Sequence, residues 1–312
     1  MTNNRIPLLI DTDPGVDDAL ALLMAFNDTR HDVVALTIAA GNVGLDHTVA
    51  NALKLSEVCG VNVPVFAGAG APLLHPALDA AYVHGRDGFG DTGYVPATRQ
   101  AQSEHAALAI LRISHEYAGR LLLVALGPLT NVALALKLDP TLPQRIARFV
   151  VMGGAVSAHG NITPAAEFNI AFDPEAAHIV FTAFQRIEVA DWEAVMAHGL
   201  PHPEVERWLT ADSPRARFYD GISAHTRAWA RAGRGERWHA ADALAMALAL
   251  EPDGAVEVLE RPLAVELDGR HTRGTTVIDW NQQRGAANNA VIMMRYDQAR
   301  FERLLEAALA AS

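Results

Sequence analysis

Near-continuous apolar runs alternate with amphipathic stretches up to about residue 190, and this alternation limits the folds open to the chain. A strand that is apolar on both faces must be covered on both sides, which is typical of a parallel sheet between helices. We therefore predict an α/β protein with a mostly parallel central sheet flanked by helices. The expected strands are Pro7–Ile10, Val33–Ala39, Val63–Phe66, Leu121–Leu126, Ile146–Met152 and Ile187–Ala190, and the expected helices are Asp17–Phe26, Thr48–Cys59, Glu104–Glu116, Leu129–Lys137 and Pro174–Phe184.

The pattern changes in the last third of the chain. From about residue 192 to 251 it is mostly helical, with a glycine-containing break at 233–235, as expected of a cover over a cleft. Residues 256–295 are then predicted as short strands, and Gln298–Ala310 as a closing amphipathic helix. Because no repeat or linker divides the chain, residues 1–312 are predicted to form a single domain with a helical elaboration over the active-site cleft.

Bulk composition excludes several classes of partner. The formal net charge is −11, from 36 acidic and 25 basic residues, which disfavours nucleic acid and anionic membranes. The sequence has no apolar stretch of about 18 residues and no secretory leader pattern. Cys59 is the only cysteine, so an intrachain disulfide is impossible. We expect a cytoplasmic protein with no nucleic-acid or membrane partner.

The segment LLIDTDPGVDDALALL (8–23) places four carboxylates, Asp11, Asp13, Asp17 and Asp18, within eight positions behind an apolar run. Asp11 and Asp13 lie two apart in an extended strand, so they share one face. The favourable interaction of acidic residues with the first turn of a helix explains Asp17 or Asp18, but not the other two. Oxygen ligands without cysteine or clustered histidine indicate a hard cation, Ca²⁺ or Mg²⁺.

An apolar strand that ends in Asp-x-Asp also opens the Mg²⁺-dependent phosphatases of the haloacid-dehalogenase type, whose first Asp is a nucleophile. In those enzymes Thr or Val with an aliphatic follower usually comes next, whereas this chain has Pro14 and Gly15. Two further carboxylates add charge that phosphoryl transfer does not obviously need, and no motif supplies a lysine partner. The phosphatase is therefore the less favoured alternative.

The segment DTDPGVDDALAL resembles the N-terminal signature of the inosine–uridine-preferring nucleoside hydrolases, and the agreement continues in order along the chain. The further segments are TIAAGNVGLD (37–46), VHGRDGFG (83–90), LVALGPLTNVALAL (123–136), VVMGGAVSAHGNITPAAEFNIAFDPEAA (150–177) and ADALAMALALEPD (241–253). The resemblance implies an α/β fold around a largely parallel sheet, a bound Ca²⁺ and hydrolysis of the N-glycosidic bond of ribonucleosides to ribose and free base. It also implies a homodimer or homotetramer.

The resemblance carries roles to individual positions. Asp13 matches the general base that activates a metal-bound water, and it is also a metal ligand. Asp18, the backbone carbonyl of Leu126 and Asp242 complete the implied metal set, with Asp11 as a supporting carboxylate. The positions implied to contact substrate are Asp17, Asn42, Met152, Asn161, Glu167 and Asn169 on the ribose side, and His84 on the base side.

The chain departs from the family pattern where the leaving base is handled. Many relatives have a histidine immediately before the last metal-binding Asp, but this chain has Ala241, and the tryptophan of the purine-specific branch is absent as well. Candidates for protonating the base are His239, His84 and His225, unless the enzyme relies mainly on ribose-side activation. Trp229 is a candidate stacking surface for a nucleobase.

A second class of function stays open from the sequence alone. A non-catalytic nucleoside- or ribose-binding protein would keep the metal cup and lose the acid at position 241. Asp13 argues for the enzyme, because a binding protein has no need of the general base.

Overall fold

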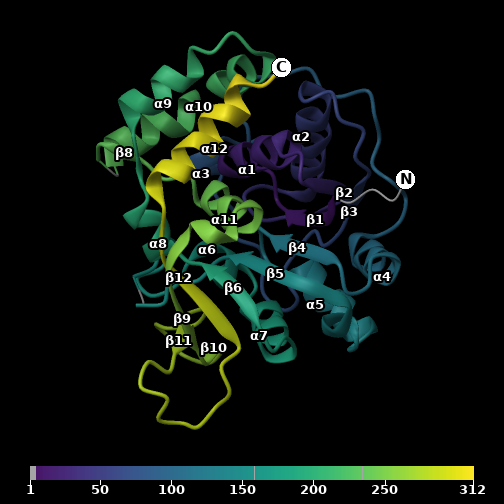
Figure 1. The fold of residues 1–312 in the computed structure, drawn as a ribbon, viewed down its shortest axis with the longest axis vertical. Helices are drawn as coiled ribbons and strands as arrows, with labels where there is room; N and C mark the ends of the chain where they lie inside the picture. Colours follow the sequence, from purple (N-terminus) through teal and green to yellow (C-terminus); the bar gives the residue numbers. More distant parts are fainter. Residues whose placement is uncertain (1–4, 158, 234) are drawn as a thin grey trace.

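A computed structural model describes residues 5–157, 159–233 and 235–312, and an eight-stranded sheet forms its centre (Figure 1). The strand order is β3-β2-β1-β4-β5-β6-β12-β9. Neighbouring strands run parallel except β12 and β9, which are antiparallel. The strands are β1 (Ile6–Thr12), β2 (His31–Ile38), β3 (Val65–Ala67), β4 (Leu121–Ala125), β5 (Ile146–Met152), β6 (Ile187–Ala190), β9 (Ala255–Arg261) and β12 (Ala290–Tyr296).

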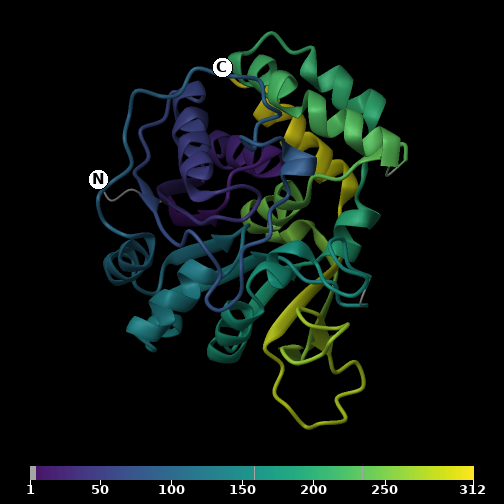
Figure 2. The ribbon, with the colours of Figure 1, turned by 180° about the vertical axis from the view of Figure 1, so that it is seen from behind.

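Helices cover both faces of this sheet (Figures 1 and 2). Along each strand successive side chains point to opposite faces, so Leu8 and Ile10 of β1 enter one core and Leu9 enters the other. The first core includes residues of α1 (Val16–Asn27), α2 (Leu45–Val58), α10 (Pro214–Gly233), α11 (Ala241–Leu250) and α12 (Gln298–Ala310). The second core includes residues of α4 (Ala106–Glu116), α5 (Thr130–Leu138) and α7 (Pro174–Ala183).

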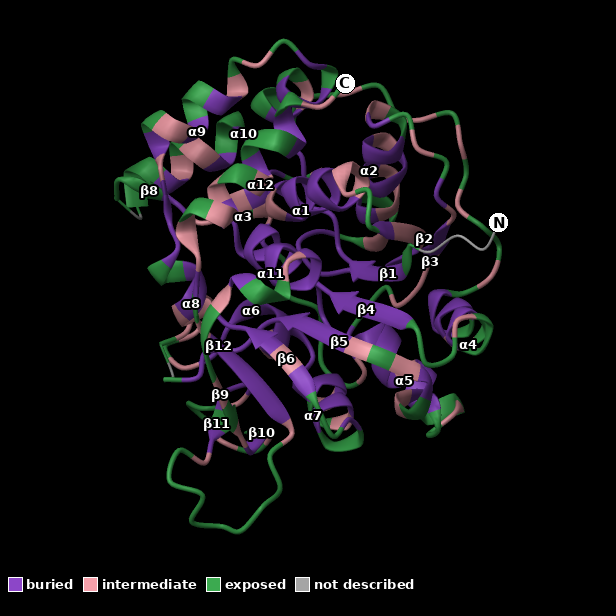
Figure 3. Ribbon diagram, viewed as in Figure 1, coloured by how far each residue is buried: buried purple, intermediate pink, exposed green. Residues whose placement is uncertain are grey.

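Burial on both faces explains why the strands are apolar throughout. Every residue of β4, and every residue of β1 after Ile6, is buried (Figure 3). The predicted fold class, an α/β protein with a mostly parallel sheet between helices, is confirmed. Each of the six predicted strands and five predicted helices is present, with ends shifted by a few residues. The assignment of residues 1–312 to one domain stays a prediction.

The helical elaboration follows β6. It contains α8 (Trp192–Ala197), α9 (His202–Leu209) and α10, and a two-stranded pair of β7 (Leu200–Pro201) with β8 (Arg237–Trp238) returns the chain to α11. Figure 1 shows α9 and α10 beside α12. Residue 234, within the predicted break at 233–235, lies outside the described residues.

The predicted short strands of 256–295 divide between two sheets. β12 joins the main sheet beside β6 and β9 closes its edge, whereas β10 (Leu263–Val265) and β11 (Thr276–Ile278) form a separate antiparallel pair. Two short helices, α3 (Ala81–His84) and α6 (Phe168–Phe172), and the 3₁₀ turns at Leu142–Arg145 and Pro252–Gly254 complete the fold. Within the described ranges, every helix is either too short or too polar to cross a bilayer.

The first core also fixes α11, which carries Asp242 in its first turn. The hydroxyl of Tyr296 on β12 lies 3.0 Å from the carbonyl oxygen of Ala247 and 2.9 Å from that of Glu251, so it satisfies the C-terminal end of α11. We expect Tyr296→Phe to lower the free energy of unfolding by about 1 kcal/mol, because the two carbonyls keep their backbone donors but lose the hydroxyl as a second donor. Urea denaturation followed by circular dichroism measures the change.

Tyr117→Phe is the control, because Tyr117 is a half-buried residue at the end of α4 on the other face of the sheet. Equal losses in the two variants would show that the hydroxyl of Tyr296 does not stabilise α11.

Candidate functional site

The carboxyl end of β1 lies where the strand order reverses. From β1 the chain proceeds to β2 and β3 on one side, and it then returns to β4 and continues to β5 and β6 on the other. Such a switch point leaves a crevice at the carboxyl ends of the two central strands. The backbone amide of Leu126 donates to the carbonyl oxygen of Asp11 at 2.8 Å, so the loop after β4 lies directly beside the acidic segment after β1.

The carboxylate of Asp13 occupies a close-fitting space at this end of the sheet. Its Oδ2 accepts the backbone amide of Asn42 at 2.7 Å, and the residue is 1% exposed. A Cβ on Gly41 would lie 2.1 Å from Oδ2, and a Cβ on Gly127 would lie 2.2 Å from Oδ1. Asp13 therefore leaves no room for a side chain at either position, and only glycine fits there. The sequence interpretation missed them, because only the fold brings these two loops against β1.

Both carboxylate oxygens of Asp18 accept hydrogen bonds. Its Oδ1 accepts the hydroxyl of Thr12 and, at 3.3 Å, the backbone amide of Asp13. Its Oδ2 accepts the backbone amide of Gly15 at 3.0 Å and the side-chain amide of Asn42 at 2.9 Å. The same Asn42 amide lies 3.2 Å from the carbonyl oxygen of Asp13. Asn42 thus connects the loop after β2 to both aspartates.

Three carboxylates in this region offer a cation site. Asp17, Asp18 and Asp242 each present an oxygen within 4.8 Å of the others. Burial and the charge of Asp18 raise the pKa of Asp13 well above its usual range, and burial followed by the charge of Asp17 does the same for Asp242. Oδ1 of Asp17 is buried and has no hydrogen-bond partner among the described residues. These oxygens fit a hard divalent cation, which would offset the repulsion among them.

Two members of the predicted metal set make other contacts in the structure. The carbonyl oxygen of Leu126 accepts the side-chain amide of Asn169 at 2.6 Å. Asp13 lies near the three clustered carboxylates, and burial followed by the charges of Asp18 and Asp17 raises its pKa. Its Oδ2 accepts the backbone amide of Asn42. Their assignment as metal ligands stays a prediction.

We call Asp13, Asp17, Asp18 and Asp242 the acidic layer, and Asp11 lies behind it. It is fully buried, and its Oδ1 accepts the hydroxyl of Thr37 at 2.7 Å and the side-chain amide of Asn131 at 2.9 Å. Burial raises its pKa to about 7, against the lowering effect of these two bonds. Asn131 also accepts the amide of Ala69 at 2.8 Å, so Asp11 binds β2 and the start of α5 directly and, through Asn131, the segment after β3.

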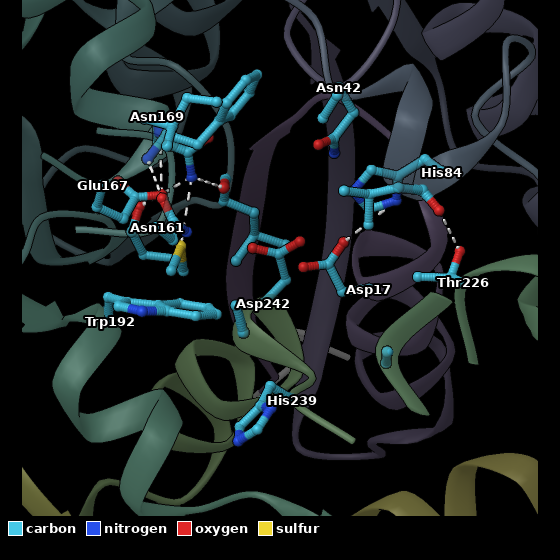
Figure 4. A pocket seen from close by; sticks show the side chains of 18 of the residues that line it. Asp17, Asn42, His84, Asn161, Glu167, Asn169, Trp192, Thr226, His239 and Asp242 are labelled. Carbon is cyan, nitrogen blue, oxygen red and sulfur yellow. Dashed lines mark hydrogen bonds and ion pairs between the residues drawn. The ribbon is translucent and has the colours of Figure 1, made fainter. Parts of the chain in front are cut away.

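The acidic layer opens onto a cavity whose empty space, counted together with the solvent at its mouth, is about 830 Å³ (Figure 4). Asp11, Asp13 and Asp18 lie behind its wall, while the other predicted site residues line it: Asp17, Asn42, His84, Leu126, Met152, Asn161, Glu167, Asn169, Trp229, His239 and Asp242.

One side of the cavity is built by the loop between β5 and α6. The carboxylate of Glu167 accepts the amides of Gly154 and Asn169, each at 2.9 Å, and thereby caps α6. Burial raises the pKa of Glu167 to about 7. Oδ1 of Asn161 accepts the amide of Phe168 at 2.8 Å, and the side-chain amide of Asn169 lies 3.3 Å from the carbonyl oxygen of Met152. Polar atoms of one short segment thus converge on the cavity.

His84 faces these residues from the opposite side (Figure 4). Its Nδ1 accepts the backbone amide of Val16 at 3.1 Å, so the neutral ring carries its proton on Nε2. Burial lowers the pKa of His84 to about 4. The hydroxyl of Thr226 on α10 donates to the carbonyl oxygen of Val83 at 2.8 Å, which ties α10 to α3.

The other histidine candidates differ in position. His239 lines the cavity, and its ring centroid lies 6.2 Å from that of Trp192, whereas His225 is exposed on α10 and is not part of the lining. Ala241 stands at the first position of α11, is buried and lines the cavity. The place of the missing histidine is therefore occupied by a methyl group.

Among the aromatic residues of the lining, Trp229 was a predicted candidate, whereas the sequence interpretation missed Tyr82, Phe168 and Trp192. Tyr82 and Trp229 form an edge-to-face pair with centroids 6.0 Å apart, and Trp192 and Phe168 line the cavity from α8 and α6. Tyr82 stands beside the His84 loop motif, which was a usable signal. Nothing local distinguishes Trp192 from a core tryptophan.

Comparison with known proteins agrees with this geometry. The family model described as inosine-uridine preferring nucleoside hydrolase matches residues 8–303. A non-specific ribonucleoside hydrolase, RihC of Salmonella enteritidis, is 37% identical over 290 residues, which are 93% of each chain. A plant nucleoside hydrolase superposes with a TM-score of 0.93 and 30% identity, covering 98% of this chain and 99% of its own. A purine-preferring ribonucleoside hydrolase from Gardnerella vaginalis gives 0.90 and 28%, covering 97% and 98%.

Both the family match and the 37% relative extend over nearly the whole chain, and they select the hydrolase over the phosphatase. The chain therefore belongs to the inosine–uridine-preferring nucleoside hydrolase family and is an N-glycosidase of ribonucleosides.

Proposed function

We propose that this enzyme hydrolyses ribonucleosides with a bound Ca²⁺, and that Asp13 is the general base. The observation that carries the proposal is the meeting of Asp17, Asp18 and Asp242 within 4.8 Å beside the buried Asp13. A donor set made only of oxygens favours Ca²⁺ or Mg²⁺, and the family resemblance favours Ca²⁺. When bound, the cation would supply positive charge that orients water and sugar hydroxyls and lowers the pKa of that water.

Asp13 would accept the proton of the attacking water. Water oxygen forms a bond to the anomeric carbon, the bond from that carbon to the base nitrogen breaks, and the electron pair leaves with the base. Glycosidic cleavage of this kind needs an activated water on one face of the sugar. The amide of Asn42 and the walls at Gly41 and Gly127 fix the carboxylate for this step. General-base assistance is worth about 10²–10⁴ in rate.

The ribose would be held by polar side chains around the acidic layer. Asp17 and Asn42 approach from one side of the cavity, and Asn161, Glu167 and Asn169 from the other (Figure 4). Met152 is proposed to contact the sugar as well. A site whose buried polar groups are matched to hydroxyls discriminates strongly against substrates that lack them, because those groups would lose their partners.

The leaving base would lie on the side of His84 and the aromatic pair of Tyr82 and Trp229. Since Val16 occupies Nδ1 of His84, its Nε2–H is the group available to a base nitrogen. His239 is the second candidate donor. Ala241 places no proton donor at the usual position, so this side of the site must differ from that of relatives with histidine there.

Further predictions concern the setting of the enzyme. Release of free base and ribose suits nucleoside catabolism or purine and pyrimidine salvage. The homodimer or homotetramer, the cytoplasmic location, and the expectation of no nucleic-acid or membrane partner stay predictions.

Removal of divalent cations should abolish the activity and weaken the fold in a pH-dependent way. Burial raises the pKa of Asp11 to about 7 and of Asp17 to about 6, above the ordinary value of an aspartate. The cation-free protein therefore binds protons on folding and loses stability as pH rises from about 4 through 7. We expect EDTA to stop ribose release and to lower Tm more at pH 8 than at pH 5.5, with both restored by Ca²⁺.

The measurements are a free-ribose assay on a nucleoside panel and differential scanning calorimetry. No ribose from any nucleoside with Ca²⁺ present would instead favour a nucleoside-binding protein. An equal Tm loss at both pH values would contradict the buried-carboxylate account of the site.

Gly127→Ala should disable Asp13 without unfolding the protein. The added Cβ would lie 2.2 Å from Oδ1 of Asp13, so the carboxylate must move. We expect kcat/KM for ribonucleosides to fall by at least about 100-fold, because general-base help is lost. Gly44→Ala is the matched control, since its Cβ meets nothing within 4 Å. Comparable activity in both variants would rule out the proposed role of the Asp13 pocket.

Replacing His84, His225 and His239 singly by Ala should separate leaving-group chemistry from ribose chemistry. We expect the variants of the cavity residues His84 and His239 to lose at least tenfold in kcat on inosine and uridine, and His225→Ala to lose little. On p-nitrophenyl riboside, whose leaving group needs no proton, all three should stay near wild type. Equal losses on p-nitrophenyl riboside would refute the acid role.

A further inference from the structure

The loop between β5 and α6 carries Asn161, and core packing alone does not hold it. Its described residues from 157 to 164 are exposed or half-buried. At its base, Gly154 donates to Glu167 at 2.9 Å, and Phe168 donates to Asn161 at 2.8 Å. These bonds fix the base of the loop, and backbone amides from Gly160 to Thr163 bond to Pro164 and Ala166 in its later part. The earlier part, with Ser157 and His159, needs another anchor.

Glu193 of α8 supplies that anchor. Its Oε2 accepts the backbone amide of Val156 at 2.8 Å, and its Oε1 accepts those of Ser157 at 2.8 Å and His159 at 3.4 Å. These amides belong to an irregular segment with no strand or helix partner. Hydrogen bonds to an ionised carboxylate are stronger than those between neutral groups, so one side chain orders three backbone amides of the loop.

Asp191 completes the attachment from the end of β6. It is 1% exposed, and it accepts the amide of Val156 at 3.1 Å through Oδ2 and that of Ala194 at 2.9 Å through Oδ1. Burial, and next its hydrogen bond to Glu193, raise the pKa of Asp191 to about 8. Asp191 therefore keeps its proton at neutral pH, and the pair carries a single negative charge on the side of Glu193.

The residue between the two acids reaches the substrate cavity. The backbone amide of Trp192 donates to the carbonyl oxygen of Gly154 at 2.9 Å, and its indole lines the cavity on the side of Asn161 and Glu167 (Figure 4). Asp191, Trp192 and Glu193 thus connect the end of β6 both to the base of the loop and to its outward part.

We propose that Glu193 is a positioning residue for ribose binding, which holds the backbone amides of Val156, Ser157 and His159 so that Asn161 faces the sugar. The inference rests on the proposed function, because it takes Asn161 as a ribose contact. Loss of the anchor loosens the segment before Asn161, which is then held only by its bonds to Ala166 and Phe168, and substrate binding must order the loop at a cost in affinity. The effect should appear mainly in KM, since Asn161 contacts the sugar before and during bond cleavage.

A double-mutant cycle tests the coupling. Kinetic constants for inosine are measured, with Ca²⁺ present, for wild type, Glu193→Gln, Asn161→Ala and the double variant. The glutamine keeps the size of the side chain but removes the charge and turns one oxygen into a donor that faces an amide. We expect KM to rise about tenfold in Glu193→Gln with kcat within about twofold of wild type. In the Asn161→Ala background the same change should have little further effect.

Hydrogen exchange supplies a readout that needs no substrate. We expect the amides of Ser157 and His159 to exchange about tenfold faster in Glu193→Gln, while the amide of Ile170 in α6 keeps its protection. Glu204→Gln is the matched control, because Glu204 lies half-exposed on α9 and pairs with Arg207 of its own helix. That control should leave both kinetics and exchange at wild-type values.

The outcomes separate the inference from the proposed function. Equal losses in the wild-type and Asn161→Ala backgrounds, or unchanged exchange at Ser157, would overturn the role of Glu193. Absence of ribose release from wild type would overturn the proposed function, and unchanged exchange in Glu193→Gln would then still refute the anchor. A variant that fails to fold, judged by circular dichroism, is replaced by Glu193→Asp, whose shorter reach should loosen the same amides.

Discussion

Four aspartates gathered at the end of one buried strand set the main physical constraint on this protein. Taking carboxylates out of water and placing them side by side costs free energy through both desolvation and mutual repulsion. The structure meets part of that cost with donors: Asn42 and Thr12 bind Asp18, and Thr37 and Asn131 bind Asp11. The raised pKa values of the cluster show that the donors alone are insufficient. A bound cation is the natural complement, and the proposed chemistry uses the same charge.

The parallel sheet gives this cluster its place. β1 is bonded on both sides, so its end is rigid, and the loops after β2 and β4 close over it from either side. Gly41 and Gly127 come from those loops and touch opposite oxygens of Asp13. The general base that we propose needs an accurately placed carboxylate, and the accuracy would come from backbone packed against both oxygens.

The two halves of the cavity are built differently. The proposed ribose side comes from strand ends and from the β5–α6 loop, where each polar side chain has a backbone partner. The proposed base side comes from α3 and from the helical elaboration, where aromatic rings meet edge to face and Ala241 offers no polar atom. Under this proposal the sugar would meet side chains with fixed backbone partners, whereas the base would meet a mainly aromatic surface beside His84 and His239. This division agrees with substrates that share a ribose and vary in the base.

The sequence by itself determined the parallel α/β fold and the carboxylate cluster. Through the residues and order of its motifs it also determined the family. Apolar runs and turn residues are local signals, and Asp11 and Asp13 share a face because a strand repeats every two residues. Only the tertiary structure decided which distant groups meet. It brought Gly41 and Gly127 against Asp13, Val16 against His84, and Trp192 and Glu193 against the loop of Asn161. These contacts join residues far apart in the chain, and their partners are set by strand order and packing, which no local pattern encodes.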